Sequence, residues 1–242
     1  MRPITTLVLL PGLDGTGILF EPLLKHLPQH ISAQVIALPH DCPLDYRSLV
    51  DFVSPSLPID EPYFMLGESF SGPLALMIAD RKPPQLKGVI LCATFIRNPT
   101  YLPSFLHHVA GTWMFYFAPL FIQAKALFAG YSNPELSKLL RHAHEKVAPA
   151  VMANRIRTVL RLHCERELQQ CTVPLAYIRG SMDSVVPKKN YEEIRKLKPG
   201  VREYVISAPH LILQTQPAAA AEAIENFIKD VDGLHPEGLR KK

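Results

Sequence analysis

Short apolar runs recur along this chain, and segments with helical spacing lie between them. The strand-like runs cover residues 5–10, 33–38, 62–66, 87–93, 173–180 and 201–206. The helical segments cover residues 18–27, 45–53, 73–79, 188–196 and 217–230. Continuous apolar strands that alternate with helices are typical of a sheet buried on both faces. The pattern therefore predicts an α/β protein with a mostly parallel sheet.

The alternation stops between residues 97 and 166, where no strand-like run occurs. Helical segments occupy this stretch instead, around residues 104–117, 119–128, 134–144 and 149–164. Gly, Pro and Asn separate them, as expected of helix ends. We therefore predict a helical lid at residues 97–166, inserted into an α/β core formed by residues 1–96 and 167–232. Residues 233–242 are expected to form a flexible tail.

The composition is that of a globular protein. The chain has 242 residues, of which 48% are hydrophobic and 20% charged, so a single domain with a large core is expected. No run of 18 apolar residues occurs, and we expect no transmembrane segment. The N-terminus lacks the polar spacer and small-residue cleavage site of a secretory signal. These features predict a cytoplasmic protein.

The sequence favours neither a metal site nor nucleic acid binding. The four cysteines are scattered, without the paired spacing of metal ligands, and are interpreted as free thiols. His142 and His144 stand two residues apart on a predicted helix, so they would point to different faces. His163 is placed on the helix predicted at residues 149–164. The net charge of +4 is too small to indicate a nucleic acid partner.

The predicted lid concentrates positive charge. Residues 97–166 contain nine Lys or Arg and three Glu, a net charge of +6, which leaves −2 for the rest of the chain. One interpretation is an ordinary solvated face. The other is a docking surface for an acidic partner, to which Arg155, Arg157 and Arg161 would contribute.

One motif stands at the centre of the α/β pattern. Residues 67–72 read Gly-Glu-Ser-Phe-Ser-Gly and join a predicted buried strand to a predicted helix. A serine on a sharp strand-to-helix turn needs small neighbours two positions away on either side, and Gly67 and Ser71 meet that need. Ser69 is therefore interpreted as a nucleophile. The alternative is an ordinary turn with a surface serine.

A glycine-rich stretch at residues 11–17, Pro-Gly-Leu-Asp-Gly-Thr-Gly, follows the first predicted strand. It lacks the Lys followed by Ser or Thr of a nucleotide-binding loop, and its spacing is not that of a dinucleotide-binding motif. Such a loop at the end of a strand can direct a backbone N–H toward a developing oxyanion. A plain strand-to-helix turn is the alternative.

A reactive serine hydroxyl requires a base, and the base requires an acid that fixes its tautomer. Asp183 lies in the loop after the strand predicted at residues 173–180, and His210 lies in the loop after the last strand. Both are therefore expected at the C-terminal edge of the sheet with Ser69, where ligand clefts of open α/β sheets form. The alternatives are a helix cap for Asp183 and a surface loop position for His210.

These motifs together resemble the α/β-hydrolase superfamily over about residues 4 to 230, and the chain is similar to its compact, lidded bacterial esterases. Residues 10–17, Leu-Pro-Gly-Leu-Asp-Gly-Thr-Gly, also resemble the hydrolase portion of plant phytyl ester synthases, which are acyltransferases. The chain departs from the superfamily in two places. Ser71 replaces the last glycine of the serine motif, and Pro11 stands where many members have histidine.

The resemblance implies a catalytic triad of Ser69, Asp183 and His210. It also implies an oxyanion hole formed by the backbone amides of Leu13 and Phe70. The residues expected to support the turn and the loop are Gly12, Gly67, Ser71 and Gly72.

The expected activity is hydrolysis of carboxylic esters with short to medium acyl chains, through an acyl-enzyme and without a metal or organic cofactor. Ser69 excludes haloalkane dehalogenases and epoxide hydrolases, which share the fold but need aspartate as nucleophile. The aromatic residues of the lid form either its core or the wall of a substrate site. In the second case Trp113 and Phe117 are the expected substrate contacts.

Three alternatives remain open. The basic lid also fits a substrate carried on acidic acyl carrier protein, and in this respect the chain looks like the pimeloyl carrier-protein methyl ester esterases. Acyl transfer to an alcohol is the second alternative. Peroxidase activity is expected only as a side reaction of such serine hydrolases. A hydrolase fold kept as a non-catalytic ligand-binding module is the third.

Overall fold

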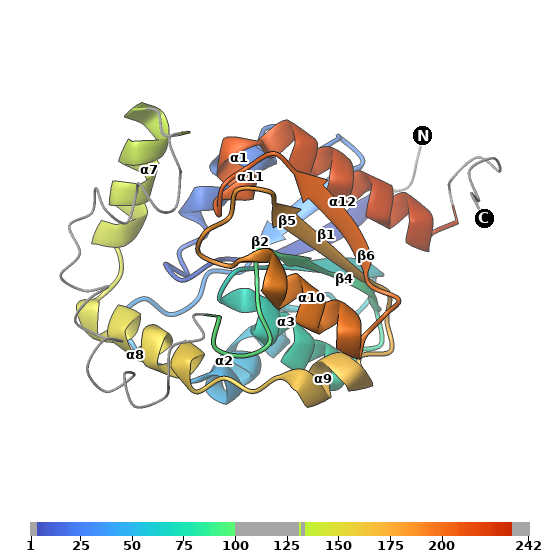
Figure 1. The fold of residues 1–242 in the computed structure, drawn as a ribbon, viewed down its shortest axis with the longest axis horizontal. Coiled ribbons are helices and arrows are strands. Elements are labelled where there is room, and N and C mark those ends of the chain that lie inside the picture. The colour runs from blue at the N-terminus through green and yellow to red at the C-terminus, as the bar shows by residue number, and fades with distance from the viewer. Residues whose placement is uncertain (1–3, 100–130, 132–133, 234–242) are drawn as a thin grey trace.

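The fold is built on one six-stranded sheet (Figure 1). The computed structural model describes residues 4–99, 131 and 134–233. The strands are β1 (Thr5–Leu10), β2 (Ile31–Val35), β3 (Tyr63–Glu68), β4 (Leu86–Cys92), β5 (Leu175–Gly180) and β6 (Arg202–Ile206). Their order is β2-β1-β3-β4-β5-β6, and every neighbouring pair is parallel. The predicted α/β class with a mostly parallel sheet is confirmed.

Successive side chains of each strand point to opposite faces of the sheet, and helices bury both faces. In β1, Val8 and Leu10 pack on one face, while Leu7 and Leu9 pack on the other. The first face is covered by α2 (Tyr46–Val53), α3 (Ser71–Asp80) and α10 (Lys188–Leu197). The second is covered by α1 (Glu21–Leu24), α11 (Ile212–Thr215) and α12 (Pro217–Val231) (Figure 1).

The second strand does not lie where the sequence pattern puts it. A strand was expected at residues 33–38, but β2 covers Ile31–Val35 and pairs only with β1. The Ile36 N–H still donates to the Leu9 carbonyl of β1 at 3.1 Å, but the paired register ends at Val35. Ile36 and Leu38 are nevertheless buried. Their apolar character reflects packing against the core rather than strand pairing.

Two helix predictions also need correction. The helix expected at residues 18–27 is a 3-10 turn, Ile18–Phe20, followed by the short helix α1. The helix expected at residues 149–164 is α8 (Pro149–Leu160), after which a separate helix, α9 (Glu165–Gln170), begins. Between these two helices His163 forms an isolated antiparallel bridge with Arg97, so it is not helical as predicted.

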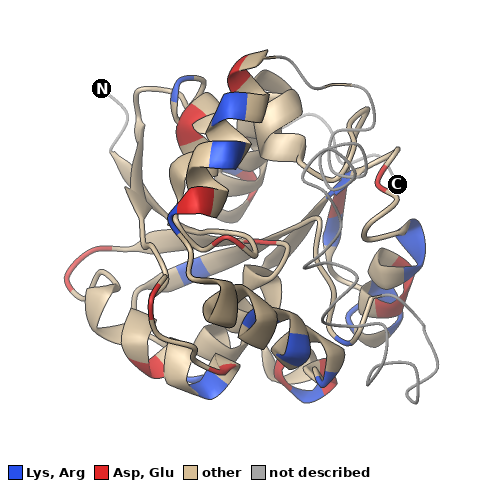
Figure 2. Cartoon of the chain, turned by 90° about the vertical axis from the view of Figure 1, so that its left-hand side faces the viewer, with Lys and Arg blue, Asp and Glu red and all other residues tan. Residues whose placement is uncertain are grey.

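Part of the predicted lid falls outside the described residues, including the helices expected at 104–117 and 119–128. The helix expected at 134–144 is present as α7 (Pro134–Glu145). It packs through Leu136 and Leu140 on Leu19 and Leu211 of the core. In Figure 2, where α7 and α8 face the viewer, Lys and Arg colour both helices.

Within the described ranges, no helix is long and apolar enough to cross a membrane.

Candidate active site

Ser69 stands on the turn between β3 and α3. Its φ of +47° lies in the left-handed region, which a residue with a Cβ adopts only when its surroundings enforce it. A Cβ on Gly67 would overlap the carbonyl oxygen of Ser71, and a Cβ on Gly72 would overlap the Thr94 side chain. The turn therefore requires glycine at both positions, and it presents the Ser69 hydroxyl at the carboxyl edge of the sheet.

Ser69, His210 and Asp183 form a continuous hydrogen-bonded chain. The Ser69 Oγ lies 3.0 Å from His210 Nε2, and His210 Nδ1 lies 2.8 Å from Asp183 Oδ2. The other carboxylate oxygen of Asp183 accepts the backbone N–H groups of Val185 and Val186, at 2.9 and 2.8 Å. These two bonds fix the carboxylate so that Oδ2 faces the imidazole. With Nδ1 donating to Asp183, Nε2 is left as an acceptor for the serine proton.

The loop after β1 lies directly beside the serine. A Cβ on Gly12 would stand 3.9 Å from the Cβ of Ser69. The Gly12 carbonyl accepts the Gly15 N–H at 3.0 Å, which closes a turn. In a planar trans peptide the N–H points opposite to the C=O, so the Leu13 N–H points out of this turn. Within the described residues, the N–H groups of Leu13 and Phe70 donate to no protein acceptor, so both are available to a ligand oxygen.

Glu68, which precedes the serine, is an unexpected buried carboxyl group. It accepts a hydrogen bond from the Gln214 amide at 2.9 Å, and the Gly12 N–H also interacts with it. Burial raises the pKa of Glu68 to about 7, and the nearby Asp14 carboxylate adds to the rise. The Glu68 carboxyl group is therefore expected to change its charge near neutral pH. It does so next to Ser69, which follows it in the chain. Its position inside the 67–72 motif was the only sequence signal for it.

Polar contacts from neighbouring elements hold the turn in place. The Thr94 hydroxyl donates to the Ser69 carbonyl, and the Tyr177 hydroxyl donates to the Thr94 carbonyl at 2.5 Å. The Tyr46 hydroxyl donates to the Phe70 carbonyl at 2.8 Å, and the two rings stack with centroids 4.8 Å apart. The sequence pattern predicted a role for none of these three side chains. Only Thr94, which follows β4 at the same edge of the sheet, carried a positional signal.

Arg155 does not lie where the sequence analysis places it. It was expected on a basic face with Arg157 and Arg161, but it is 2% exposed and turned into the core. Its guanidinium donates to backbone carbonyls of the loop after β1. The expectation is therefore wrong for Arg155. Arg157 and Arg161 are exposed.

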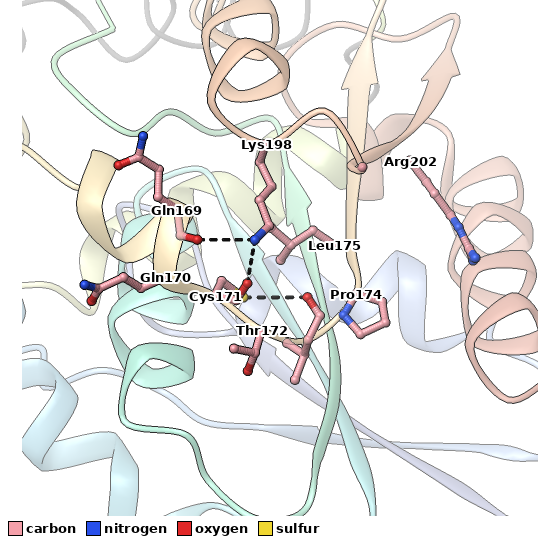
Figure 3. Close-up of a pocket in the computed structure, with 10 residues that line it drawn as sticks. Gln169, Gln170, Cys171, Thr172, Pro174, Leu175, Lys198 and Arg202 are labelled. Carbon is pink, nitrogen blue, oxygen red and sulfur yellow. Dashed lines mark hydrogen bonds between the residues drawn. The ribbon is translucent and has the colours of Figure 1, made fainter.

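Two open pockets flank the core. One, of about 500 Å³, lies near Lys198 and the starts of β5 and β6 (Figure 3). Ser69 follows the carboxyl end of β3, so this pocket opens at the opposite edge of the parallel sheet. The other, of about 550 Å³, lies between the start of α2 and the end of α8. We call it the basic groove. Its lining includes Asp45, Arg47, Arg157, Arg161 and His163.

The remaining predictions concern substrate contacts and metals. The expected substrate contacts Trp113 and Phe117 lie outside the described residues. Among the residues that the structure describes, no three His, Cys, Asp or Glu side chains come together as a metal site. The described geometry thus centres on Ser69, His210 and Asp183.

Several known proteins are similar to this chain in sequence or in fold. A pimeloyl-[acyl-carrier protein] methyl ester esterase of Neisseria meningitidis serogroup C is 23% identical, over 92% of this chain and 93% of that protein. A biotin biosynthesis bifunctional protein of Cellvibrio japonicus is 26% identical over 93% of this chain, which spans about half (47%) of its length.

The fold recurs in solved structures of low sequence identity. A lipase-esterase related protein from Clostridium acetobutylicum has a TM-score of 0.78 at 18% identity, over 93% of this chain and 95% of that one. A bromoperoxidase from Bacillus anthracis has a TM-score of 0.80 at 14% identity, over 94% and 92%. The family model Hydrolase_4, described as serine aminopeptidase, S33, matches residues 39–206. This match, together with the parallel sheet on which it falls, shows that the chain belongs to the Hydrolase_4 family of α/β hydrolases.

Proposed function

We propose that this protein is a serine hydrolase that cleaves carboxylic esters through an acyl-enzyme intermediate. The observation that carries the proposal is the hydrogen-bonded chain from Asp183 through His210 to Ser69, with distances of 2.8 and 3.0 Å. Such a chain converts an unreactive hydroxyl into a nucleophile, because the base stands ready to take its proton.

The reaction begins when Ser69 Oγ attacks the ester carbonyl carbon and His210 Nε2 takes the hydroxyl proton. The imidazolium that forms is stabilised by Asp183, whose carboxylate keeps its orientation through two backbone amides. His210 then gives the proton to the leaving alkoxide oxygen, and the alcohol departs. A water molecule, deprotonated by the same nitrogen, attacks the acyl carbonyl and releases the acid, and Ser69 regains its proton.

The backbone amides of Leu13 and Phe70 would stabilise the tetrahedral oxyanion. Both N–H groups lack a protein acceptor among the described residues, and Leu13 follows Gly12, on which an added Cβ would stand 3.9 Å from the Ser69 Cβ. A well-placed donor of this kind is worth roughly 3–4 kcal/mol in the transition state. The Phe70 N–H also stands at the N-terminus of α3, where the helix dipole favours negative charge.

The division into an α/β core and a lid at residues 97–166 is part of the proposal. It is supported by α7, which packs on Leu211, the residue after His210. An insertion anchored beside the imidazole is well placed to cover the acyl group. In this arrangement Trp113 and Phe117 remain the predicted acyl contacts.

A substrate linked to acyl carrier protein is the second candidate. Two observations favour it. Several relatives are named pimeloyl-[acyl-carrier protein] methyl ester esterase, and the basic groove brings Arg47, Arg157, Arg161 and His163 to one surface. Exposed cations attract an acidic carrier over a Debye length and raise its association rate.

The chemistry is tested with p-nitrophenyl esters of increasing chain length. We expect Ser69→Ala to lower kcat by about 10⁴- to 10⁶-fold with an unchanged circular dichroism spectrum. The exposed Ser56→Ala serves as control and should keep wild-type turnover. A fluorophosphonate should label the wild type but not Ser69→Ala. Undiminished turnover or labelling in Ser69→Ala would refute the assignment. The series of esters would show which acyl chain length the site accepts.

A further inference from the structure

We propose that Arg155 is a positioning residue for the oxyanion hole: from α8 it holds the loop after β1 in the conformation that presents the Leu13 N–H to the substrate oxygen. This inference rests on the proposed function. It gives Arg155 a role inside the protein rather than on a docking surface.

The environment of Arg155 is unusual for a charged side chain. It is 2% exposed, and within the described residues no salt bridge links it to a carboxylate. Instead Nη1 donates to the carbonyls of Leu13 and Asp14, at 2.8 and 2.7 Å, and Nη2 donates to the Pro39 carbonyl at 2.8 Å. Burying a charge is costly unless strong hydrogen bonds compensate it. All three compensating bonds go to backbone, so the guanidinium fixes the path of two loops.

The guanidinium remains charged despite this burial. Burial lowers the pKa of Arg155 to about 10, while the neighbouring Asp14 carboxylate opposes that shift. At neutral pH the group therefore donates charge-assisted bonds, which are about twice as strong as neutral ones.

Arg155 completes a set of partners for consecutive carbonyls of the loop. The Gly15 N–H holds the Gly12 carbonyl at 3.0 Å, and the Leu38 N–H holds the Gly15 carbonyl at 2.7 Å. The two carbonyls between them, of Leu13 and Asp14, are held by Arg155. Each bonded carbonyl fixes one peptide plane. The Leu13 N–H shares a peptide plane with the Gly12 carbonyl, and the Gly15 N–H that holds this carbonyl shares a plane with the Asp14 carbonyl. Without Arg155 the Asp14 carbonyl loses its partner, so the Gly15 N–H, and through it the Leu13 N–H, is no longer held in one direction.

The same guanidinium also touches the second proposed donor residue. Its central carbon lies 5.8 Å from the centroid of the Phe70 ring, which also stacks on the Tyr46 ring. A Cβ on Gly15 would overlap the guanidinium, so the loop is shaped to admit this side chain. Arg155 thus contacts both residues whose amides would bind the oxyanion, although it is too buried to reach the substrate itself.

A matched control stands next to it on the helix. Asn154 also ties α8 to the core, through a hydrogen bond from its amide to the Leu44 carbonyl at 3.0 Å, but that bond goes to a different loop. Asn154→Ala should weaken the attachment of α8 to the core without altering the loop after β1. Comparing variants of Arg155 and Asn154 therefore separates two effects: the anchoring of α8 and the positioning of the Leu13 N–H.

The test compares Arg155→Lys, Arg155→Met and Asn154→Ala with the wild type. For each we would measure kcat and KM for p-nitrophenyl acetate, the rate constant of fluorophosphonate labelling, and the inhibition constant of a trifluoromethyl ketone. The ketone binds as a tetrahedral oxyanion adduct, so it reports the oxyanion hole, and thermal unfolding of each variant reports stability. Arg155→Lys keeps the charge and keeps the test informative if Arg155→Met does not fold.

We expect Arg155→Met to lower kcat by 10- to 100-fold and to weaken ketone binding by a similar factor, with KM changed less than threefold. Arg155→Lys should lie between it and the wild type, and Asn154→Ala should lose thermal stability while retaining ketone affinity. Wild-type ketone affinity and labelling in folded Arg155 variants would overturn the inference, and so would an equal loss in Asn154→Ala. If the wild type itself fails to label, the proposed function fails, and this inference fails with it.

Discussion

The Ser71 hydroxyl donates a 2.5 Å hydrogen bond to the carbonyl oxygen of Pro11, and this bond ties the first turn of α3 to the loop after β1. These are the two positions at which the chain departs from the pattern of its superfamily. In this protein the departures compensate each other. Ser71 is fully buried and provides the donor that the buried Pro11 carbonyl needs.

The first prediction concerns that hydrogen bond. Ser71→Ala leaves the Pro11 carbonyl buried without its partner, so the free energy of unfolding should fall by about 1–3 kcal/mol. Ser71→Gly, which restores the residue usual in the superfamily, should be less stable still, because glycine in a helix costs up to about 1 kcal/mol more than alanine. Urea unfolding of the three proteins measures both steps.

The half-buried Ser54 offers a control, because its hydroxyl donates to the Val50 carbonyl within a helix end that water can reach. Ser54→Ala should therefore cost less than Ser71→Ala. A Ser71→Gly variant as stable as the wild type would show that the bond to Pro11 contributes nothing.

The second prediction concerns the orientation of the candidate base. In Asp183→Asn the side-chain oxygen should keep the two bonds from Val185 and Val186, which turns the amide NH₂ toward His210 Nδ1. The imidazole must then carry its proton on Nε2, which can no longer accept the Ser69 proton. We expect kcat to fall by about 10⁴-fold in a folded protein.

The tautomer change is visible in the ¹⁵N shifts of the imidazole by NMR. Asp51→Asn is the control: Asp51 is exposed and pairs with Arg81, so its loss should leave kcat unchanged. An Asp183→Asn variant with wild-type kcat would contradict the proposed role of Asp183.

The sheet could be predicted from sequence because its signal is local. Each buried strand is a continuous apolar run, and the order of the loops after β3, β5 and β6 brings Ser69, Asp183 and His210 to one edge. The error at β2 has the opposite origin. The apolar run at residues 33–38 reflects the burial of Ile36 and Leu38, and it does not indicate where pairing with the distant strand β1 stops.

The burial of Arg155 could not be predicted from the pattern of charged residues in the sequence. Its partners are backbone carbonyls, which every residue has, so no sequence pattern indicates that it turns inward while Arg157 stays in solvent. The end of α8 was missed for a related reason. Just after α8, His163 forms a bridge with Arg97, and such a tertiary contact between distant segments leaves no local signal in the sequence.

The third prediction concerns a carrier-linked substrate. Reversing the exposed pair Arg157→Glu and Arg161→Glu changes the charge of the basic groove by −4 without touching the buried Arg155. We expect kcat/KM for an ester carried on acyl carrier protein to fall by about 10- to 1000-fold at low salt, while kcat/KM for p-nitrophenyl acetate stays the same. The loss should shrink as added salt screens the charges.

A matched reversal on α10, Arg195→Glu with Lys196→Glu, makes the same charge change on exposed residues of another helix. If both double variants lose carrier-linked activity equally, the net charge of the protein matters and the groove does not. Equal loss on the small ester would instead point to damage at the active site.

The fourth prediction uses the buried carboxyl group beneath the serine. Burial raises the pKa of Glu68 to about 7 from an ordinary value of 4.5. A carboxyl group with a raised folded-state pKa gives its full contribution to stability below the unfolded pKa, and the contribution is lost as pH rises through the folded value. Ionisation of Glu68 should therefore cost the protein about 3 kcal/mol between pH 4.5 and pH 8.

Glu68→Gln removes this titration and keeps the shape of the side chain. Its amide can also donate to the Gln214 Oε1, which is buried without a partner among the described residues. The free energy of unfolding of Glu68→Gln, relative to the wild type, should rise between pH 5 and pH 8, with most of the rise before pH 7.5. In urea titrations the exposed Glu222→Gln should give a difference that is flat with pH. A flat difference for Glu68→Gln as well would mean that this carboxyl group is already ionised at pH 5, and that the interactions with Gly12 and Gln214 outweigh its burial.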